Sequence, residues 1–356
     1  MRILFGIPRK VHNGIAIAEV EAFKKLGDNV EISDYGNSGE ESGLVKSLIL
    51  VFKNAINLKR KSKNQKSEIV YLNTAFDNKT IFRDSITIFI LRTFNKKIKI
   101  VFKIHGSIKS VVLSKRNILK WYLFNKVSLF LVLSKEELNT FLETGINQDK
   151  VKVTANAIDS TQYIPDSRFR KTYEIESDKI ILLFVGRFIE EKGIIDVINA
   201  CKLLQENSVR FELFCLGDGP LFEKVKSQIE YLKLENNIKL LGHIPEEKTR
   251  PFYSNCDILI LPTFHAEGFP MAIFQAVASG MSIITTKIRA SADYLKEYEN
   301  CLWVKRNSPT DIYDKILILE KDKELREKIG KNNLCLSDRF TADNIVGNLN
   351  IYLRNF

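Results

Sequence analysis

The sequence is poor in the residues that bind metals or form disulfides. Its 356 residues include four histidines, which are scattered, and five cysteines, which all lie in the second half. No Cys-x-x-Cys pair occurs and the cysteine count is odd, which argues against a disulfide or zinc framework and is typical of reduced thiols. We therefore expect no metal site and no disulfides, in a cytoplasmic protein.

Long apolar runs are also missing. No stretch approaches the roughly 18 uncharged apolar residues of a membrane-spanning helix, so none is expected. Residues 1–5 form a short apolar run that predicts a strand, and we expect no signal peptide. The dinucleotide-binding pattern Gly-x-Gly-x-x-Gly does not follow this strand. With 45% hydrophobic residues, the chain is long enough for about two domains, each with its own core.

Positive charge is concentrated in the first half. The net charge of +11 divides into +13 for residues 1–170 and −2 for residues 171–356. From Arg92 to Lys126 there are ten Lys or Arg and no acidic residue. The positive electrostatic potential around such a segment attracts an anionic membrane or a polyanion. We predict contact with an anionic membrane surface through residues 44–66 and 92–126. A solvated helix whose aromatic side chains face the core remains the alternative for residues 114–126.

The first half alternates apolar strands with amphipathic helices, as a Rossmann-like parallel sheet requires. Asn13 and Gly14 lie in the loop after the predicted first strand, and His105 follows the fourth. By themselves these residues are typical of an ordinary βα turn and a surface histidine. The predicted strands are 2–7, 29–32, 68–73, 99–104, 127–134 and 151–153, and the predicted helices are 15–26, 42–58, 80–94 and 135–144.

The second half repeats this alternation around residues 261–286, which predict strand, loop, helix, turn and strand. A loop between the carboxyl end of a parallel strand and a helix N-terminus is where open α/β sheets bind ligands. The free N–H groups of the helix suit an anion. The other predicted strands here are 179–185, 211–216 and 238–242, and the predicted helices are 197–205, 221–232, 246–256, two within 309–330, and 339–356.

Three segments of this half resemble the retaining glycosyltransferases of family four, which have the two-domain GT-B fold. The loop Glu267-Gly268-Phe269-Pro270 matches the Glu-Gly-Phe-Gly/Pro motif of the family, and small residues follow at the family's spacing. Residues 186–193 match its Gly-Arg-Phe and Glu-Lys-Gly pattern, and residues 217–220 match a further Gly-Asp-Gly-Pro turn. Two positions depart from the family pattern: Gln275 stands where the family has a second Glu, and Ser282 stands where it has a Pro.

The resemblance implies an α/β protein of GT-B type, in which two Rossmann-like parallel-sheet domains face an interdomain cleft. The implied domains are an acceptor-side domain at residues 1–165, a linker at 166–177 and a nucleotide-sugar-binding domain at 178–338. A last helix at 339–356 would cross back to the first domain.

The implied activity is transfer of a sugar from a nucleotide-diphosphate sugar to a glycan or a polyprenyl-linked saccharide, with retention of anomeric configuration, in surface-polysaccharide synthesis. The enzyme would work in the cytoplasm or peripherally on the inner face of the membrane. The leaving diphosphate gains negative charge, which the planar fork of Arg187 and the ammonium of Lys192 would stabilise without a metal or another cofactor.

The family resemblance also assigns roles to other residues. Glu267 would bind hydroxyls of the donor sugar, and His105 would lie near that sugar. The remaining positions expected to bind substrate are Asn13, Gly14, Gly186, Ile244, Gly268, Phe269, Pro270, Met271 and Gln275.

Gln275 is the main departure from the family pattern. The family glutamate accepts hydrogen bonds from ribose hydroxyls, and an amide oxygen accepts them without charge. The difference of ~1 kcal/mol corresponds to about fivefold in donor affinity, so Gln275→Glu is expected to keep or improve the donor KM. The alternative functions are an inactive GT-B homologue that binds a glycan or a partner, a nucleotide-sugar epimerase of the same fold, and a nucleic-acid binder. No nucleic-acid-binding module is recognisable, and no nucleic-acid partner is expected.

Overall fold

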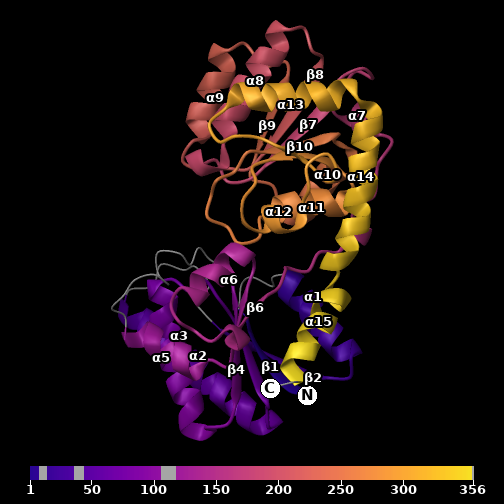
Figure 1. Cartoon of the computed structure of the whole chain (residues 1–356). Helices are drawn as coiled ribbons and strands as arrows, with labels where there is room; N and C mark the ends of the chain where they lie inside the picture. Colours follow the sequence, from indigo (N-terminus) through magenta and orange to yellow (C-terminus); the bar gives the residue numbers. More distant parts are fainter. Residues whose placement is uncertain (8–13, 36–43, 106–117, 355–356) are drawn as a thin grey trace. The chain divides into compact units, whose positions relative to one another are not determined.

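The chain divides into two compact units in a computed structural model that describes residues 1–7, 14–35, 44–105 and 118–354. The first unit comprises Met1–Ala157, Ala266–Phe269 and Ala342–Phe356. The second unit comprises Ile158–His265 and Pro270–Thr341. Each unit contains one six-stranded sheet with helices packed on it (Figure 1).

The first sheet has the strand order β2-β1-β3-β4-β5-β6, and all its neighbouring strands are parallel. Most of its side chains are buried, which explains the nearly continuous apolar runs in the sequence. Its strands are β1 (Arg2–Ile7), β2 (Asn29–Asp34), β3 (Ile69–Thr74), β4 (Lys99–Ile104), β5 (Leu129–Val132) and β6 (Val151–Val153).

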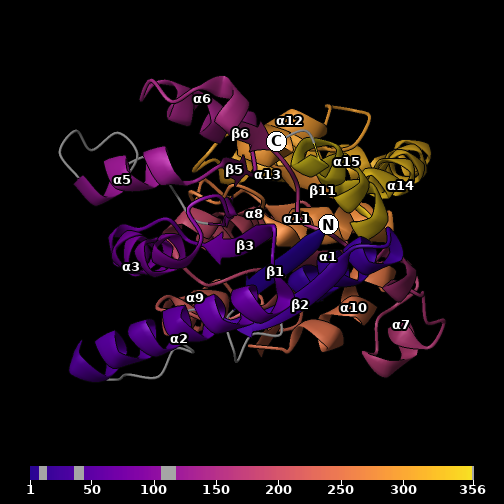
Figure 2. The same cartoon turned by 90° about the horizontal axis from the view of Figure 1, so that it is seen from below.

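Helices cover both faces of this sheet. The helix α3 contacts both α2 and α5, and these three helices pack on one face (Figure 2). On the other face α1 contacts α15, the last helix of the chain. The helices of the first unit are α1 (Gly14–Lys25), α2 (Leu44–Gln65), α3 (Asn78–Phe94), α5 (Ile118–Lys126), α6 (Lys135–Leu142) and α15 (Ala342–Arg354), with the 3-10 turn η1 (Gln148–Lys150).

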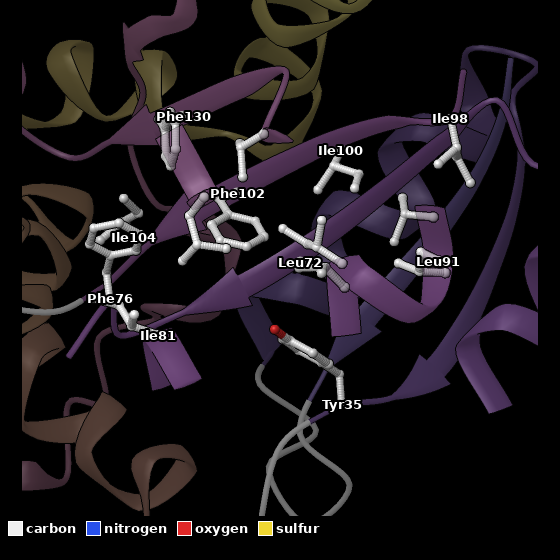
Figure 3. Packing of buried hydrophobic residues seen from close by; sticks show 14 of the residues in the cluster. Tyr35, Leu72, Phe76, Ile81, Leu91, Ile98, Ile100, Phe102, Ile104 and Phe130 are labelled. Atoms are coloured by element: carbon white, nitrogen blue, oxygen red, sulfur yellow. The ribbon is translucent and has the colours of Figure 1, made fainter. Parts of the chain in front are cut away.

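The core under α2, α3 and α5 is aromatic at its centre. The rings of Phe102 and Phe130 meet edge to face, with centroids 5.9 Å apart, and Phe76 packs on both (Figure 3). Leu72 and Ile100 extend the same layer along β3 and β4. Alternate residues of a strand point to opposite faces, so this layer comes from every second residue of the buried strands.

The second sheet has the order β12-β11-β10-β7-β8-β9, again with parallel neighbours. The chain starts this sheet at β7, adds β8 and β9 on one side, and then places β10 on the other side of β7. The strands are β7 (Ile180–Val185), β8 (Phe211–Leu216), β9 (Ile238–Gly242), β10 (Ile258–Leu261), β11 (Ser282–Thr285) and β12 (Leu302–Trp303).

Helices and short 3-10 turns complete the second unit. The helices are α7 (Phe169–Thr172), α8 (Ile194–Glu206), α9 (Phe222–Tyr231), α10 (Glu246–Asn255), α11 (Met271–Ser279), α12 (Arg289–Tyr294), α13 (Pro309–Lys321) and α14 (Lys323–Ser337). The 3-10 turns are η2 (Ser160–Gln162), η3 (Glu190–Lys192) and η4 (Asp338–Phe340).

Two parallel sheets packed with helices confirm the predicted α/β class. Residues 166–177, predicted as a linker, contain α7, and Phe169 of this helix packs against Phe214 and Phe252 of the second unit. The contact boundary between the units falls at residues 157 and 158.

Two helices of the first unit differ from the sequence prediction. The helix α2 extends beyond the predicted end at residue 58 and includes the basic run of residues 59–63. In α5, Lys120 belongs to the segment 92–126 that was predicted to contact an anionic membrane, but its side chain is buried. Within the described residues, no helix has the length and apolarity needed to cross a membrane.

Candidate functional site

The loops that follow β7 and β10 leave the second sheet at its topological switch point, where α/β sheets of this kind bind ligands. One carbonyl oxygen, that of Glu191, joins the two loops. It accepts hydrogen bonds from the main-chain N–H groups of Phe264 (2.8 Å) and His265 (3.1 Å) and from the hydroxyl of Thr263 (3.1 Å). The loop after β7 is therefore fixed against the loop after β10 by two main-chain hydrogen bonds and one from a side-chain hydroxyl.

A glycine makes this close approach possible. Gly193 has a φ of +73°, and a Cβ atom there would lie 2.7 Å from Cγ of Pro262. Only glycine meets both conditions without strain. The helix α8 begins directly after Gly193, and no side chain caps its N-terminus. Its first N–H groups thus stand beside the two joined loops, where they suit an anionic ligand.

Two further glycines, Gly217 and Gly219, hold the start of the loop after β7. A Cβ atom on Gly217 (φ +147°) would overlap the carbonyl oxygen of Gly186, and one on Gly219 would lie 2.6 Å from the carbonyl oxygen of Phe188. The N–H of Phe188 donates to the carbonyl of Asp218 at 2.9 Å. The motifs at residues 186–193 and 217–220 therefore form one packed main-chain unit.

The loop after β7 carries Arg187 and Lys192, the two cations predicted to stabilise a leaving diphosphate. Arg187 is exposed, and its guanidinium has no hydrogen-bond or ion-pair partner within the described part of the chain. Lys192, the last residue of η3, is buried and packs beside Gly186. A Cβ atom added to Gly186 would lie 3.7 Å from Cδ of Lys192. The loop thus presents one cation to solvent and keeps the other at its base.

Gln275 has a partner that the sequence did not indicate. This buried residue of α11 donates from Nε2 to Oε1 of Glu246 at 3.0 Å. Glu246 is exposed in the first turn of α10, two residues after the half-buried Ile244. The only sequence signal for Glu246 was its position as an acidic residue at a helix N-terminus. Acidic residues are common there because they interact favourably with the helix dipole.

The loop between β10 and α11 holds the predicted Glu-Gly-Phe-Pro motif. Glu267 is half-buried, while Gly268 and Phe269 are buried. Ala266–Phe269 belong to the first unit by their contacts, whereas Pro270 and Met271 cap and begin α11 in the second. The binding roles of these residues remain predictions.

His105 lies in the first unit, directly after β4. Its Nε2 is 2.9 Å from Oδ1 of Asn73 at the end of β3. Burial, together with the positive charge of Lys103, lowers the pKa of His105 to about 3. The imidazole is therefore neutral at neutral pH and suited to hydrogen bonding rather than to donating a proton as an acid. Gly14 begins α1, and Asn13 lies outside the described residues.

Two buried side-chain networks of the first unit also escaped sequence analysis. Lys103 of β4 pairs with Glu19 of α1, both fully buried, and its Nζ donates to the carbonyl of Ala155 at 3.1 Å. The second network centres on the buried Asp84, whose carboxylate accepts hydrogen bonds from the side chains of Tyr35, Thr74 and Arg83. Among the residues that the structure describes, no group of three His, Cys, Asp or Glu is placed to hold a metal ion.

The part of the chain that contains the switch-point loops matches a known family model. Residues 166–334 match the family model described as glycosyl transferases group 1. The matched region includes both loops joined by Glu191, together with Gln275 and Glu246.

Relatives of known sequence match the chain over part of their length. An uncharacterized glycosyltransferase of Methanocaldococcus jannaschii is 30% identical over 171 residues, which cover 48% of this chain and 47% of the relative. The capsular polysaccharide biosynthesis glycosyltransferase CapM of Staphylococcus aureus is 25% identical over 224 residues, covering 59% and 58%. The chain thus spans about half the length of these relatives.

Solved structures match the whole chain in fold. HepE of Anabaena, in complex with UDP and glucose, superposes with a TM-score of 0.80 at 18% identity and full coverage of both chains. The sucrose-phosphate synthase of Thermosynechococcus elongatus gives a TM-score of 0.79 at 14% identity, with coverage of 100% and 98%. These likenesses confirm the predicted GT-B fold class. At such identities they show the fold alone.

Proposed function

We propose that this protein transfers a sugar from a nucleoside-diphosphate sugar to a glycan or lipid-linked saccharide, with retention of configuration, in surface-polysaccharide synthesis. One observation carries the proposal. At the switch point of the second sheet, within the region that matches the glycosyl transferases group 1 model, the carbonyl of Glu191 joins two loops, one of which bears Arg187 and Lys192. The names of CapM, a capsular polysaccharide enzyme, and of HepE, bound to UDP and glucose, support the same function.

The chemistry would be leaving-group stabilisation. When the bond between the anomeric carbon and the diphosphate oxygen breaks, that oxygen gains negative charge. Arg187 binds the diphosphate with a planar fork, and Lys192 and the first N–H groups of α8 add positive potential. The acceptor hydroxyl attacks from the same face and gives its proton to the departing phosphate, while Glu267 holds donor-sugar hydroxyls. No metal or other cofactor is needed for this scheme.

The nucleoside would be held at α10 and α11. Because Nε2 of Gln275 donates to Glu246, its amide oxygen is oriented away from that contact and accepts from a ribose hydroxyl. The carboxylate of Glu246 supplies the negative charge that Gln275 lacks. The main chain at Ile244 would contact the base. In this scheme the residue pair replaces the single glutamate of the family.

Thermal shift measurements with UDP, GDP and ADP, in the presence of EDTA, test the donor site. Ligand at ~100 times Kd adds about 2.7 kcal/mol of apparent stability. We expect a shift with one nucleotide, its loss in Arg187→Ala and its retention in Arg168→Ala, where another exposed arginine of the second unit is removed. A wild-type protein that responds to none of the three nucleotides would contradict the proposal and favour an inactive homologue. NMR of the transfer product then tests retention.

A further inference from the structure

The helix α2 has two apolar faces. Val51, Ala55 and Leu58 form the inner face and are buried in the first unit. A helix that packs on a sheet needs one such stripe, and α2 has a second one that remains exposed. The outer stripe follows helical spacing and consists of Val45, Ile49, Phe52 and Ile56.

Exposed apolar side chains continue across the two neighbouring helices. Phe82 and Phe89 project from α3, seven positions apart and so on one helix face, and Ile118 and Trp121 project from α5. The helix α3 lies between α2 and α5 (Figure 2). More than half of the large hydrophobic side chains exposed in the described part of the chain belong to these three helices. They make a shared surface, which we call the outer helix face.

The outer helix face is positively charged. The three helices carry eleven Lys or Arg and one acidic residue, Asp84, which is buried against Arg83. On α2 a shallow groove places Lys53 and Arg60 beside the outer apolar stripe. An apolar surface flanked by cations and without an exposed acid on its helices complements an anionic lipid bilayer, whose headgroups are negative and whose interior is apolar.

We propose that the outer helix face binds the surface of an anionic bilayer. Its aromatic and aliphatic side chains enter the boundary between headgroups and acyl chains, and its lysines and arginines contact anionic headgroups. This inference rests on the first unit and is independent of the donor site. It changes the surface predicted from charge: Phe82 and Phe89 lie outside the predicted segments, and the buried Lys120 is excluded.

Flotation with vesicles tests the apolar part of the outer helix face. Wild-type protein is expected to float with vesicles of phosphatidylglycerol and phosphatidylethanolamine at low salt, and far less with phosphatidylcholine alone. The variant Ile49→Ser/Phe89→Ser removes side chains that are 62% and 63% exposed. The control Ile164→Ser/Tyr231→Ser removes side chains of the second unit that are 73% and 84% exposed. We expect at least about tenfold lower partitioning for the first variant, since each removed side chain contributes several apolar groups, and no change for the control.

A charge-matched pair tests the basic part. Lys53→Glu/Arg60→Glu and Lys224→Glu/Lys226→Glu make the same change in net charge, the first on α2 and the second on the exposed surface of α9. Each basic residue at an anionic leaflet contributes about fivefold to binding, so the α2 variant is expected to lose more than about tenfold. Equal losses in both variants would show attraction by net charge alone and overturn the assignment of the face.

The two tryptophans of the chain allow a direct measure of insertion. Trp121 is exposed on α5, and Trp303 lies in β12 of the second unit. In the Trp303→Phe variant, brominated lipids are expected to quench the fluorescence of Trp121. In the Trp121→Phe variant, the fluorescence of Trp303 is expected to remain. Quenching of Trp303 and not Trp121 would overturn the proposal.

Two further outcomes would reject the proposal. The first is a wild-type protein that does not bind anionic vesicles at low salt. The second is a wild-type protein that is dimeric and does not bind vesicles, together with an Ile49→Ser/Phe89→Ser variant that is monomeric. That result would make the outer helix face an interface between copies of the chain. Nucleotide thermal shifts on the same variants separate this inference from the proposed function, because loss of membrane binding with an intact nucleotide response concerns the outer helix face alone.

Discussion

Each of the two units carries a six-stranded parallel sheet, but the units hold the polar groups near their strand ends in different ways. In the second unit, main-chain atoms make the contacts, as the carbonyl of Glu191 joins two loops and Gly217 packs on the carbonyl of Gly186. In the first unit, side chains make them, as Lys103 pairs with Glu19 and the ring of His105 contacts Asn73.

The difference affects what a sequence can reveal. A site built from the main chain needs glycine wherever two backbones approach, and these glycines occur at fixed spacing. A site built from side chains needs complementary groups in space, and these come from positions far apart in the sequence. The second unit therefore carries recognisable motifs, whereas the contacts of the first unit follow from its tertiary structure. The following predictions test this contrast.

The ion pair of the first unit gives the largest expected effect. Lys103→Met leaves the carboxylate of Glu19 buried without its cation, which should cost about 3–5 kcal/mol of unfolding free energy. Glu19→Leu/Lys103→Met removes both charges and is expected to recover most of this loss. Denaturant unfolding of the single and double variants measures both effects. A cost below ~1 kcal/mol in the single variant would show that this pair does little to hold β4 on α1.

The main-chain site of the second unit is broken by one methyl group. Gly217→Ala places a Cβ atom on the carbonyl oxygen of Gly186 at a φ of +147°, and should cost about 3 kcal/mol and abolish the nucleotide thermal shift. Gly347→Ala, in α15, meets no atom within 4 Å and should stabilise by about 0.5–1 kcal/mol. Normal stability and nucleotide binding in Gly217→Ala would show that the turn is not held as described.

The pKa of His105 predicts a pH dependence. Above pH 6.5 the ring is neutral in both the folded and the unfolded chain. As the pH falls from 6.5 toward 3, the unfolded chain binds a proton that the folded chain does not, so stability falls by up to about 1.4 kcal/mol per pH unit. His105→Gln should remove this dependence, a difference of roughly 2 kcal/mol at pH 5.

The control for His105 is His243→Gln, at an exposed histidine of the second unit. It is expected to leave the pH dependence as in the wild type, because this variant retains the buried His105. NMR titration of the four imidazoles, assigned through these variants, checks the same point directly. A resonance of His105 that titrates near pH 6.5 would refute the burial argument.

The contact between Gln275 and Glu246 changes the expectation drawn from the sequence, and gives the smallest effect. Gln275→Glu places two carboxylates at hydrogen-bond distance and loses the amide donor, so nucleotide affinity should fall about fivefold, or ~1 kcal/mol, instead of improving. Glu246→Gln/Gln275→Glu exchanges the two groups and should restore binding. Calorimetric titration of the nucleotide measures each variant, with Glu247→Gln as the control for charge. Improved binding in Gln275→Glu alone would support the original expectation.

Much of the fold follows from the sequence, because buried parallel strands need continuous apolar runs and the helices between them need amphipathic ones. The family resemblance singled out Arg187, Lys192 and Gln275. Neither the apolar pattern nor the resemblance located Glu246, which is 29 positions from Gln275, or showed that α2 has an exposed second stripe. Hydropathy alone does not say which of two apolar stripes packs against the sheet.

The sequence by itself determined the α/β class, the order of most strands and helices, and the motif-bearing loops of the second unit, since each depends on local residue type and spacing. It missed the short elements α7, α12 and β12. Tertiary structure decided the partners: Glu246 for Gln275, Glu19 for Lys103, and Asn73 for His105. It also decided that the outer stripe of α2 lies beside those of α3 and α5. The physical reason is that side-chain pairing and exposure depend on which distant segments the fold brings together.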